Sequence, residues 1–69
     1  MPIQPDLSKL SARQHDVLRL LAKGLDDEAI ATRLFISTRT VAGYKQKMVD
    51  TLGLNDVAEL ARVAARIFL

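Results

Sequence analysis

The sequence predicts an all-α domain, and three observations support this fold class. Apolar residues recur at helical spacing in four stretches, each stretch follows a residue type that caps helices, and no stretch alternates with the period of a strand. The chain has 69 residues, of which 49% are hydrophobic and 26% charged, as in one small globular domain. We expect an N-terminal arm over 1–9 and a four-helix domain over 10–69.

The first helix is expected over 12–23. Ser11 can cap it, Gln14 completes a capping-box pattern, and Gly24 follows where helices commonly end. Its core positions are Val17, Leu18 and Leu21, with Leu20 beside them. The sequence therefore predicts a helix with one apolar face, which packs against the rest of the domain.

The second helix is expected over 27–34, after Asp26 as its cap. Asp27 and Glu28 in its first turn suit the positive end of the helix dipole. Its core positions are Ile30, Ala31 and Leu34. These residues predict a short helix whose first turn is acidic.

The third helix is expected over 38–52, capped by Ser37 and ended by Gly53. Its core positions are Val41, Met48 and Leu52. The fourth is expected over 56–67, with Asn55 as its cap. Its apolar positions are Val57, Leu60, Ala61 and Ala64.

Only Phe35 and Ile36 separate the second helix from the cap of the third, which predicts a helix-turn-helix. Ala31 is small where the two helices would cross, and Ile36 would fill the turn. The formal net charge of +2 comes entirely from 37–52, which contains three basic residues, Arg39, Lys45 and Lys47, and one acidic residue. Such a local basic excess favours contact with a polyanion, although it also suits a solvated helix face.

Composition excludes several other classes of protein. There is no cysteine and one histidine, so we expect no metal site, and no phosphate-binding glycine loop or nucleophile motif indicates a cofactor or an enzyme. No apolar run approaches the ~20 residues of a membrane span, and the N-terminus does not resemble a signal peptide. We expect a cytoplasmic protein, with His15 exposed and without a function.

The chain resembles the LuxR/FixJ-type (GerE-like) DNA-binding domain of bacterial transcriptional regulators from Leu10 to about Ala64. The matching stretches are Leu10-Ser11-Ala12-Arg13-Gln14, Leu21-Ala22-Lys23-Gly24, Glu28-Ala29-Ile30-Ala31, Thr40-Val41, Leu52-Gly53-Leu54 and Ala58-Glu59-Leu60. The resemblance implies four helices, of which the third enters the major groove and the fourth makes a dimer contact. The chain departs from the family at Glu28, Ala42 and Thr51, where lysine is usual. Several cations that bind phosphate in the family are thus missing.

Helical geometry turns Arg39, Gly43 and Gln46 outward from the expected core and places the stem of Lys45 toward it. Thr38 and Thr40 are placed to bind a phosphate at the start of the helix. Arg39 could bind a guanine or a phosphate, and Gln46 could bind an adenine. The expected DNA-binding residues are Thr38, Arg39, Thr40, Ala42, Gly43, Tyr44, Lys45, Gln46 and Lys47. The expected dimerisation residues are Val57, Leu60, Ala61 and Ala64.

These features predict a DNA-binding transcriptional regulator or the C-terminal output domain of a bacterial response regulator. The expected partners are double-stranded DNA, a second copy at least on DNA, and a receiver or sensor domain missing from this chain. The alternative is a helix-turn-helix module that binds protein, with weak or no DNA binding, because cations are missing and the second helix begins with three acidic residues.

Overall fold

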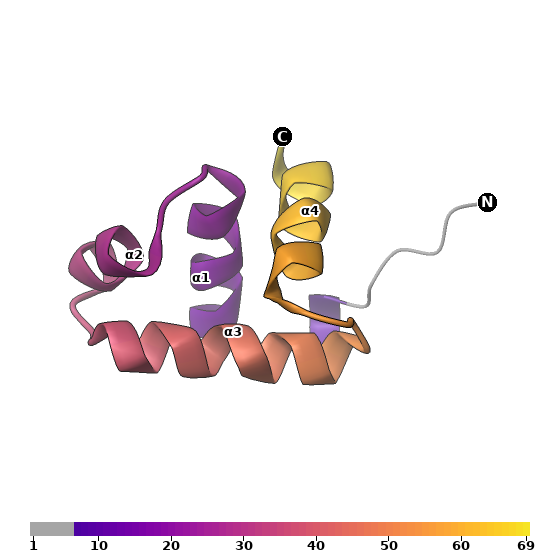
Figure 1. Ribbon diagram of the computed structural model, residues 1–69, viewed down its shortest axis with the longest axis horizontal. Coiled ribbons are helices and arrows are strands. Elements are labelled where there is room, and N and C mark those ends of the chain that lie inside the picture. The colour runs from indigo at the N-terminus through magenta and orange to yellow at the C-terminus, as the bar shows by residue number, and fades with distance from the viewer. Residues whose placement is uncertain (1–6) are drawn as a thin grey trace.

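The computed structural model describes residues 7–69. A short 3₁₀ helix, η1 (Leu7–Lys9), precedes four α-helices, and no strand occurs in this part of the chain. The helices are α1 (Ala12–Ala22), α2 (Asp27–Leu34), α3 (Thr38–Leu52) and α4 (Val57–Phe68). Helix α3 forms one side of the molecule, α1 and α4 stand side by side on it, and α2 lies beside its N-terminal end (Figure 1). The predicted all-α fold class is confirmed.

Three of the predicted caps close the helices they were assigned to. The Ser11 hydroxyl accepts from the Gln14 N–H at 3.1 Å, and the Gln14 carboxamide accepts from the Ser11 N–H at 2.8 Å. Asp26 accepts from the Ala29 N–H, and Ser37 accepts from the Thr40 N–H. Each side chain satisfies a backbone donor that the first turn of a helix cannot satisfy itself.

The predicted cap of α4 is wrong by one residue. Asp56, not Asn55, is the cap, and its carboxylate accepts from the Glu59 N–H at 2.8 Å. Asn55 instead donates through its backbone and side chain to the Glu59 carboxylate. A capping side chain accepts a hydrogen bond from a backbone N–H in the first turn of the helix that follows it. Because Asp56 is the residue that does so, α4 begins at the next residue, Val57. Helix α1 also ends one residue earlier than expected, at Ala22.

The core lies where the four α-helices meet. Its largest fully buried side chains are Val17 and Leu18 of α1, Ile30 of α2, Val41 and Met48 of α3, and Leu60 of α4. Val49 is also buried, although the sequence did not single it out, because α4 packs on α3 and widens its covered face. Three predicted core residues are only partly buried, namely Leu21, Leu34 and Leu52.

The predicted arm over 1–9 is only partly within the described residues, because 1–6 lie outside them. Its remaining residues form η1, which His15 of α1 holds in place. The Leu7 carbonyl accepts from the Leu10 N–H at 3.1 Å and from the His15 Nε2–H at 2.8 Å. The expectation of an exposed, inert His15 is therefore wrong, since the ring is half-buried and anchors a preceding turn.

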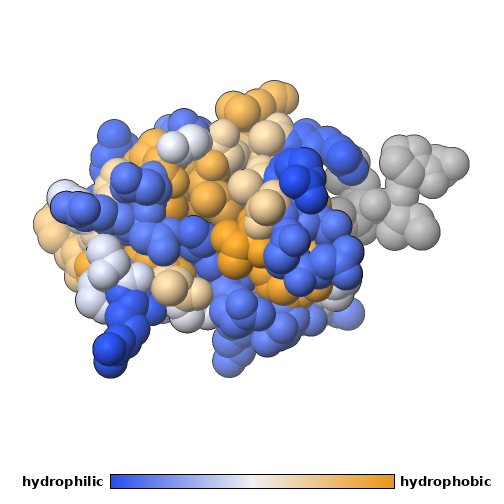
Figure 2. All heavy atoms as spheres, viewed as in Figure 1, coloured by the Kyte–Doolittle hydropathy of each residue, from blue (hydrophilic) through white to orange (hydrophobic). Residues whose placement is uncertain are grey.

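Within residues 7–69, none of the helices has both the length and the apolar character needed to cross a membrane. Hydrophilic side chains project along the lower edge of the molecule, where Figure 1 places α3 (Figure 2). The polar surface relevant to binding is therefore the side of α3 that faces away from α1 and α4.

Candidate nucleic-acid interface

The turn between α2 and α3 is built around Phe35, which adopts a left-handed conformation with φ 59° and ψ 42°. The next N–H, that of Ile36, donates to the Ala31 carbonyl at 3.0 Å, which closes the end of α2. Ile36 packs against the core, whereas the Phe35 side chain is 95% exposed. Phe35 thus makes the turn that ends α2, where a glycine is common, and α3 starts soon afterwards.

Packing between α2 and α3 decides which face of α3 remains open. Ile30 and Ala31 of α2 and Val41 of α3 are buried together in the core. Ala31 is small, which lets the two backbones approach. The opposite side of α3 is left without any covering element in the described chain.

Seven of the nine predicted DNA-binding residues are exposed along this open side of α3. They are Thr38, Arg39, Thr40, Ala42, Gly43, Gln46 and Lys47. Around the helix, Arg39, Gly43 and Gln46 lie about 140–200° from the buried Val41. Exposure is the condition that DNA contact requires, and the contact itself stays a prediction.

The polar side chains on this face differ in whether they already have partners. Within residues 7–69, neither Arg39 nor Lys47 has a side-chain hydrogen bond or ion pair, so both charges are available to a ligand. Gln46 donates to the Asp50 carboxylate at 3.3 Å. The Thr40 hydroxyl lies 2.9 Å from that of Ser37, within the helix cap. A ligand would compete for the last two groups.

Gly43 leaves the backbone of α3 open in the middle of this face. A Cβ at this position would meet no atom within 4 Å beyond the adjoining residues and backbone of α3 itself, so no packing contact requires a glycine here. The absence of a side chain instead allows another molecule to approach the helix axis closely.

The other two predicted residues lie at the edge of the open face. Tyr44 is half-buried and packs against the core. The Lys45 ammonium forms an ion pair with the carboxylate of Asp27 in the first turn of α2. The DNA contact predicted for Lys45 stays a prediction, and in the structure its ammonium is paired with Asp27 rather than free. Sequence spacing does not indicate this pair, since the two residues are eighteen positions apart.

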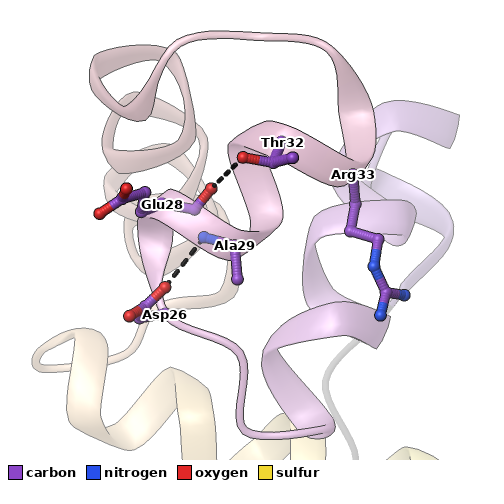
Figure 3. A pocket seen from close by; sticks show the side chains of 5 residues that line it. All are labelled: Asp26, Glu28, Ala29, Thr32 and Arg33. Carbon is purple, nitrogen blue, oxygen red and sulfur yellow. Dashed lines mark hydrogen bonds between the residues drawn. The ribbon is translucent and has the colours of Figure 1, made fainter.

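The N-terminus of α2 is occupied by the chain's own carboxylates. Asp26 accepts from the Ala29 N–H at 2.9 Å, and the Glu28 side chain points to solvent beside a shallow depression (Figure 3). The depression is lined by Asp26, Glu28, Ala29, Thr32 and Arg33. A helix N-terminus ordinarily attracts phosphate, but Asp26 already accepts from this end of α2, and the negative charges of Asp26 and Glu28 have no cationic partner within residues 7–69 and disfavour an anion here. The anion-binding potential of the motif therefore rests on α3.

The predicted dimerisation residues divide into two groups. Leu60 and Ala64 are completely buried within their own chain, so their assignment to a dimer contact is wrong. They complete the core against α1 and α3, and a second chain has no access to them. Val57 and Ala61 are half-buried and retain some accessible surface.

Comparison with known proteins gives a consistent family. Residues 8–64 match the family described as bacterial regulatory proteins, luxR family. The chain is 38% identical over 60 residues to the virulence factors putative positive transcription regulator BvgA of Bordetella pertussis, covering 87% of this chain and 29% of that protein. It is 39% identical over 57 residues to the oxygen regulatory protein NreC of Staphylococcus aureus, covering 83% of this chain and 26% of that protein. The chain thus spans less than a third of the length of these relatives.

Proposed function

The chain belongs to the luxR family of bacterial regulatory proteins, and we propose that it binds double-stranded DNA by inserting α3 into the major groove. The single observation that carries the proposal is the open face of α3, on which Arg39 and Lys47 are exposed without partners in residues 7–69. A major groove about 12 Å wide admits one α-helix. The proposed function is therefore binding in transcription regulation, and the family is not a class of enzymes.

The exposed side chains suggest a division of roles. Arg39 presents a planar fork that suits guanine O6 and N7, and Gln46 suits adenine once it leaves Asp50. Thr38 at the helix start and Lys47 further along suit phosphates. Gly43 allows close approach of the helix to the base edges.

We further propose that two copies bind together on DNA. A two-fold dimer would place its recognition helices about 34 Å apart, one turn of duplex. With Leu60 and Ala64 buried, Val57 and Ala61 are the predicted dimer residues that keep accessible surface on α4.

The relatives are much longer than this chain, which supports a role as one domain of a larger regulator. We propose that it acts as the output domain of a response regulator in the cytoplasm, where the chromosome lies. A receiver domain would then control its access to DNA or its pairing.

Fluorescence anisotropy with a random-sequence duplex tests the proposal. We expect binding that weakens steeply as salt rises, because phosphate contacts release counterions. Arg39→Ala should weaken binding, whereas Arg62→Ala removes an arginine of α4 that is also exposed and should have little effect. If neither the wild type nor an artificially dimerised chain binds at low salt, a protein-binding module is the better interpretation.

A further inference from the structure

One ion pair joins the two helices of the helix-turn-helix. Its members are the Asp27 carboxylate and the Lys45 ammonium. Among residues 7–69 it is the only side-chain hydrogen bond or ion pair between two α-helices, since the Arg19–Asp16 pair lies within α1. Asp27 is the first residue of α2, and Lys45 is the eighth of the fifteen residues of α3.

This pair is more enclosed than an ordinary surface pair. The difference lies in the cation, since the Lys45 side chain is 14% exposed and that of Arg19 55%, whereas Asp27 and Asp16 are 35% and 36% exposed. An ammonium withdrawn from water requires a partner, and the loss of that partner forces it to move. The position of Lys45 therefore depends on Asp27.

Lys45 does not share the open face of α3. It lies about 40° around the helix from the buried Val41, and Arg39 and Gly43 lie about 120° and 160° further round. Its ammonium points to α2 rather than to the surface that carries Arg39 and Lys47. The position suits a connection between helices better than a contact with a ligand of the open face.

The pair also completes the attachment of α3 to α2. The turn at Phe35 and Ile36 joins the C-terminal end of α2 to the start of α3. The ion pair joins the opposite end of α2 to the middle of α3. The ion pair therefore adds a polar attachment at the N-terminal end of α2 to the turn and to the packing of Ile30 and Ala31 with Val41, and it restricts the direction of α3 relative to α2.

We propose that Asp27 and Lys45 are positioning residues, whose ion pair sets the angle at which α3 is presented to DNA. Lys45 does not bind a phosphate in this arrangement. The inference rests on the proposed function, since the consequence of the angle is DNA affinity.

Two neighbouring carboxylates allow a matched experiment. Asp27→Asn and Glu28→Gln each remove one negative charge from the first turn of α2, but the Glu28 carboxylate has no partner in residues 7–69. Relief of repulsion alone would strengthen duplex binding in both variants. We expect Glu28→Gln to bind at least as tightly as the wild type and Asp27→Asn to bind about three- to tenfold more weakly.

The salt dependence separates positioning from phosphate contact. Lys45→Met keeps the apolar stem, and it should lose affinity as Asp27→Asn does, with an unchanged slope of log affinity against log salt. Lys47→Met, at an exposed position, should lower the magnitude of that slope by about 0.9. The Asp27→Asn/Lys45→Met double variant should be no weaker than either single variant, because both remove the same interaction.

Tighter binding by Asp27→Asn with a steeper slope would overturn the proposal, because Lys45 would then be a phosphate contact withheld by Asp27. Equal affinities for Asp27→Asn and Glu28→Gln would also overturn it. Residual dipolar couplings measure the angle between α2 and α3 without DNA, and it should change in Asp27→Asn but not in Glu28→Gln. If the wild type binds no DNA, the proposed function fails, and an unchanged angle in Asp27→Asn still refutes positioning. Unfolding midpoints confirm that each variant is folded.

Discussion

Gln46 and Asp50 are joined across one turn of α3, where the Gln46 side-chain amide donates to the Asp50 carboxylate with 3.3 Å between Nε2 and Oδ1. Both residues are exposed on the open face. The bond orients an amide that suits a base, but it also places a negative charge beside the proposed path of the duplex. We therefore expect Asp50 to limit how far along α3 DNA can be held.

Replacing Asp50 by asparagine should strengthen binding to a random duplex. The change removes one like charge from the DNA-facing side, and we expect at least about a twofold gain at low salt. The gain should shrink as salt shortens the screening length. Anisotropy titrations of Asp50→Asn and wild type across a salt series measure both effects. A loss of affinity would mean that the bond to Gln46 matters more than the charge.

Gly43→Ala should change stability and binding in opposite directions. A Cβ at this position has free space, and alanine is favoured over glycine inside a helix by about 1 kcal/mol. We therefore expect a higher free energy of unfolding in urea and a lower affinity for duplex DNA, because the new methyl group occupies the surface of closest approach. Unchanged affinity in the stabilised variant would show that DNA does not approach α3 there.

Phe35→Gly should stabilise the fold. Phe35 has φ 59°, a conformation that costs a residue with a Cβ about 1–2 kcal/mol, and its exposed ring contributes little burial. Gly53 has φ 69° at the end of α3, so Gly53→Ala is the reverse substitution in a similar conformation and should destabilise. Urea unfolding of both variants measures whether Phe35→Gly raises and Gly53→Ala lowers the free energy of unfolding. A less stable Phe35→Gly would indicate that the ring has stabilising contacts.

Substitutions at Leu60 and at Ala61 should affect different properties, the stability of the fold and the formation of a dimer on DNA. Leu60→Ala opens a cavity in the core and should lower the free energy of unfolding by about 2–5 kcal/mol. Ala61→Glu adds a charge at a half-buried position of α4, and it should prevent pairing on DNA while the monomer stays folded. Analytical ultracentrifugation with and without duplex measures pairing, and circular dichroism checks the fold. A dimer that persists in Ala61→Glu would place the contact elsewhere.

Most local interactions in this chain were predictable from the sequence, and the cap of α4, which is Asp56 rather than Asn55, is the exception. Ser11, Asp26 and Ser37 cap helices because a short side chain reaches an N–H three residues ahead, and this relation needs no tertiary structure. Gly53 ends α3 for a similarly local reason, its left-handed backbone. The same local spacing predicted the helix-turn-helix and the outward position of most of the candidate DNA-binding residues.

Interactions between distant segments were not predictable in the same way. Apolar periodicity identified Leu60 and Ala64 as one face, but it did not distinguish burial within the chain from burial against a second chain. The basic excess of 37–52 included Lys45, although Asp27 neutralises it across the helix pair. His15 was wrongly expected to be exposed and without a function, because its hydrogen-bond partner is a backbone carbonyl in the preceding turn. Each case depends on how the helices pack.

A heteronuclear NMR titration with duplex DNA would show whether α3 presents the DNA-binding surface. Backbone amide signals of the uniformly ¹⁵N-labelled chain would be followed as duplex is added at low salt. We predict that the largest shifts fall in 38–47, with small changes in the outer surfaces of α1 and α4. If the largest shifts fall in α4 or around the acidic first turn of α2, with 38–47 unchanged, α3 does not present the DNA-binding surface.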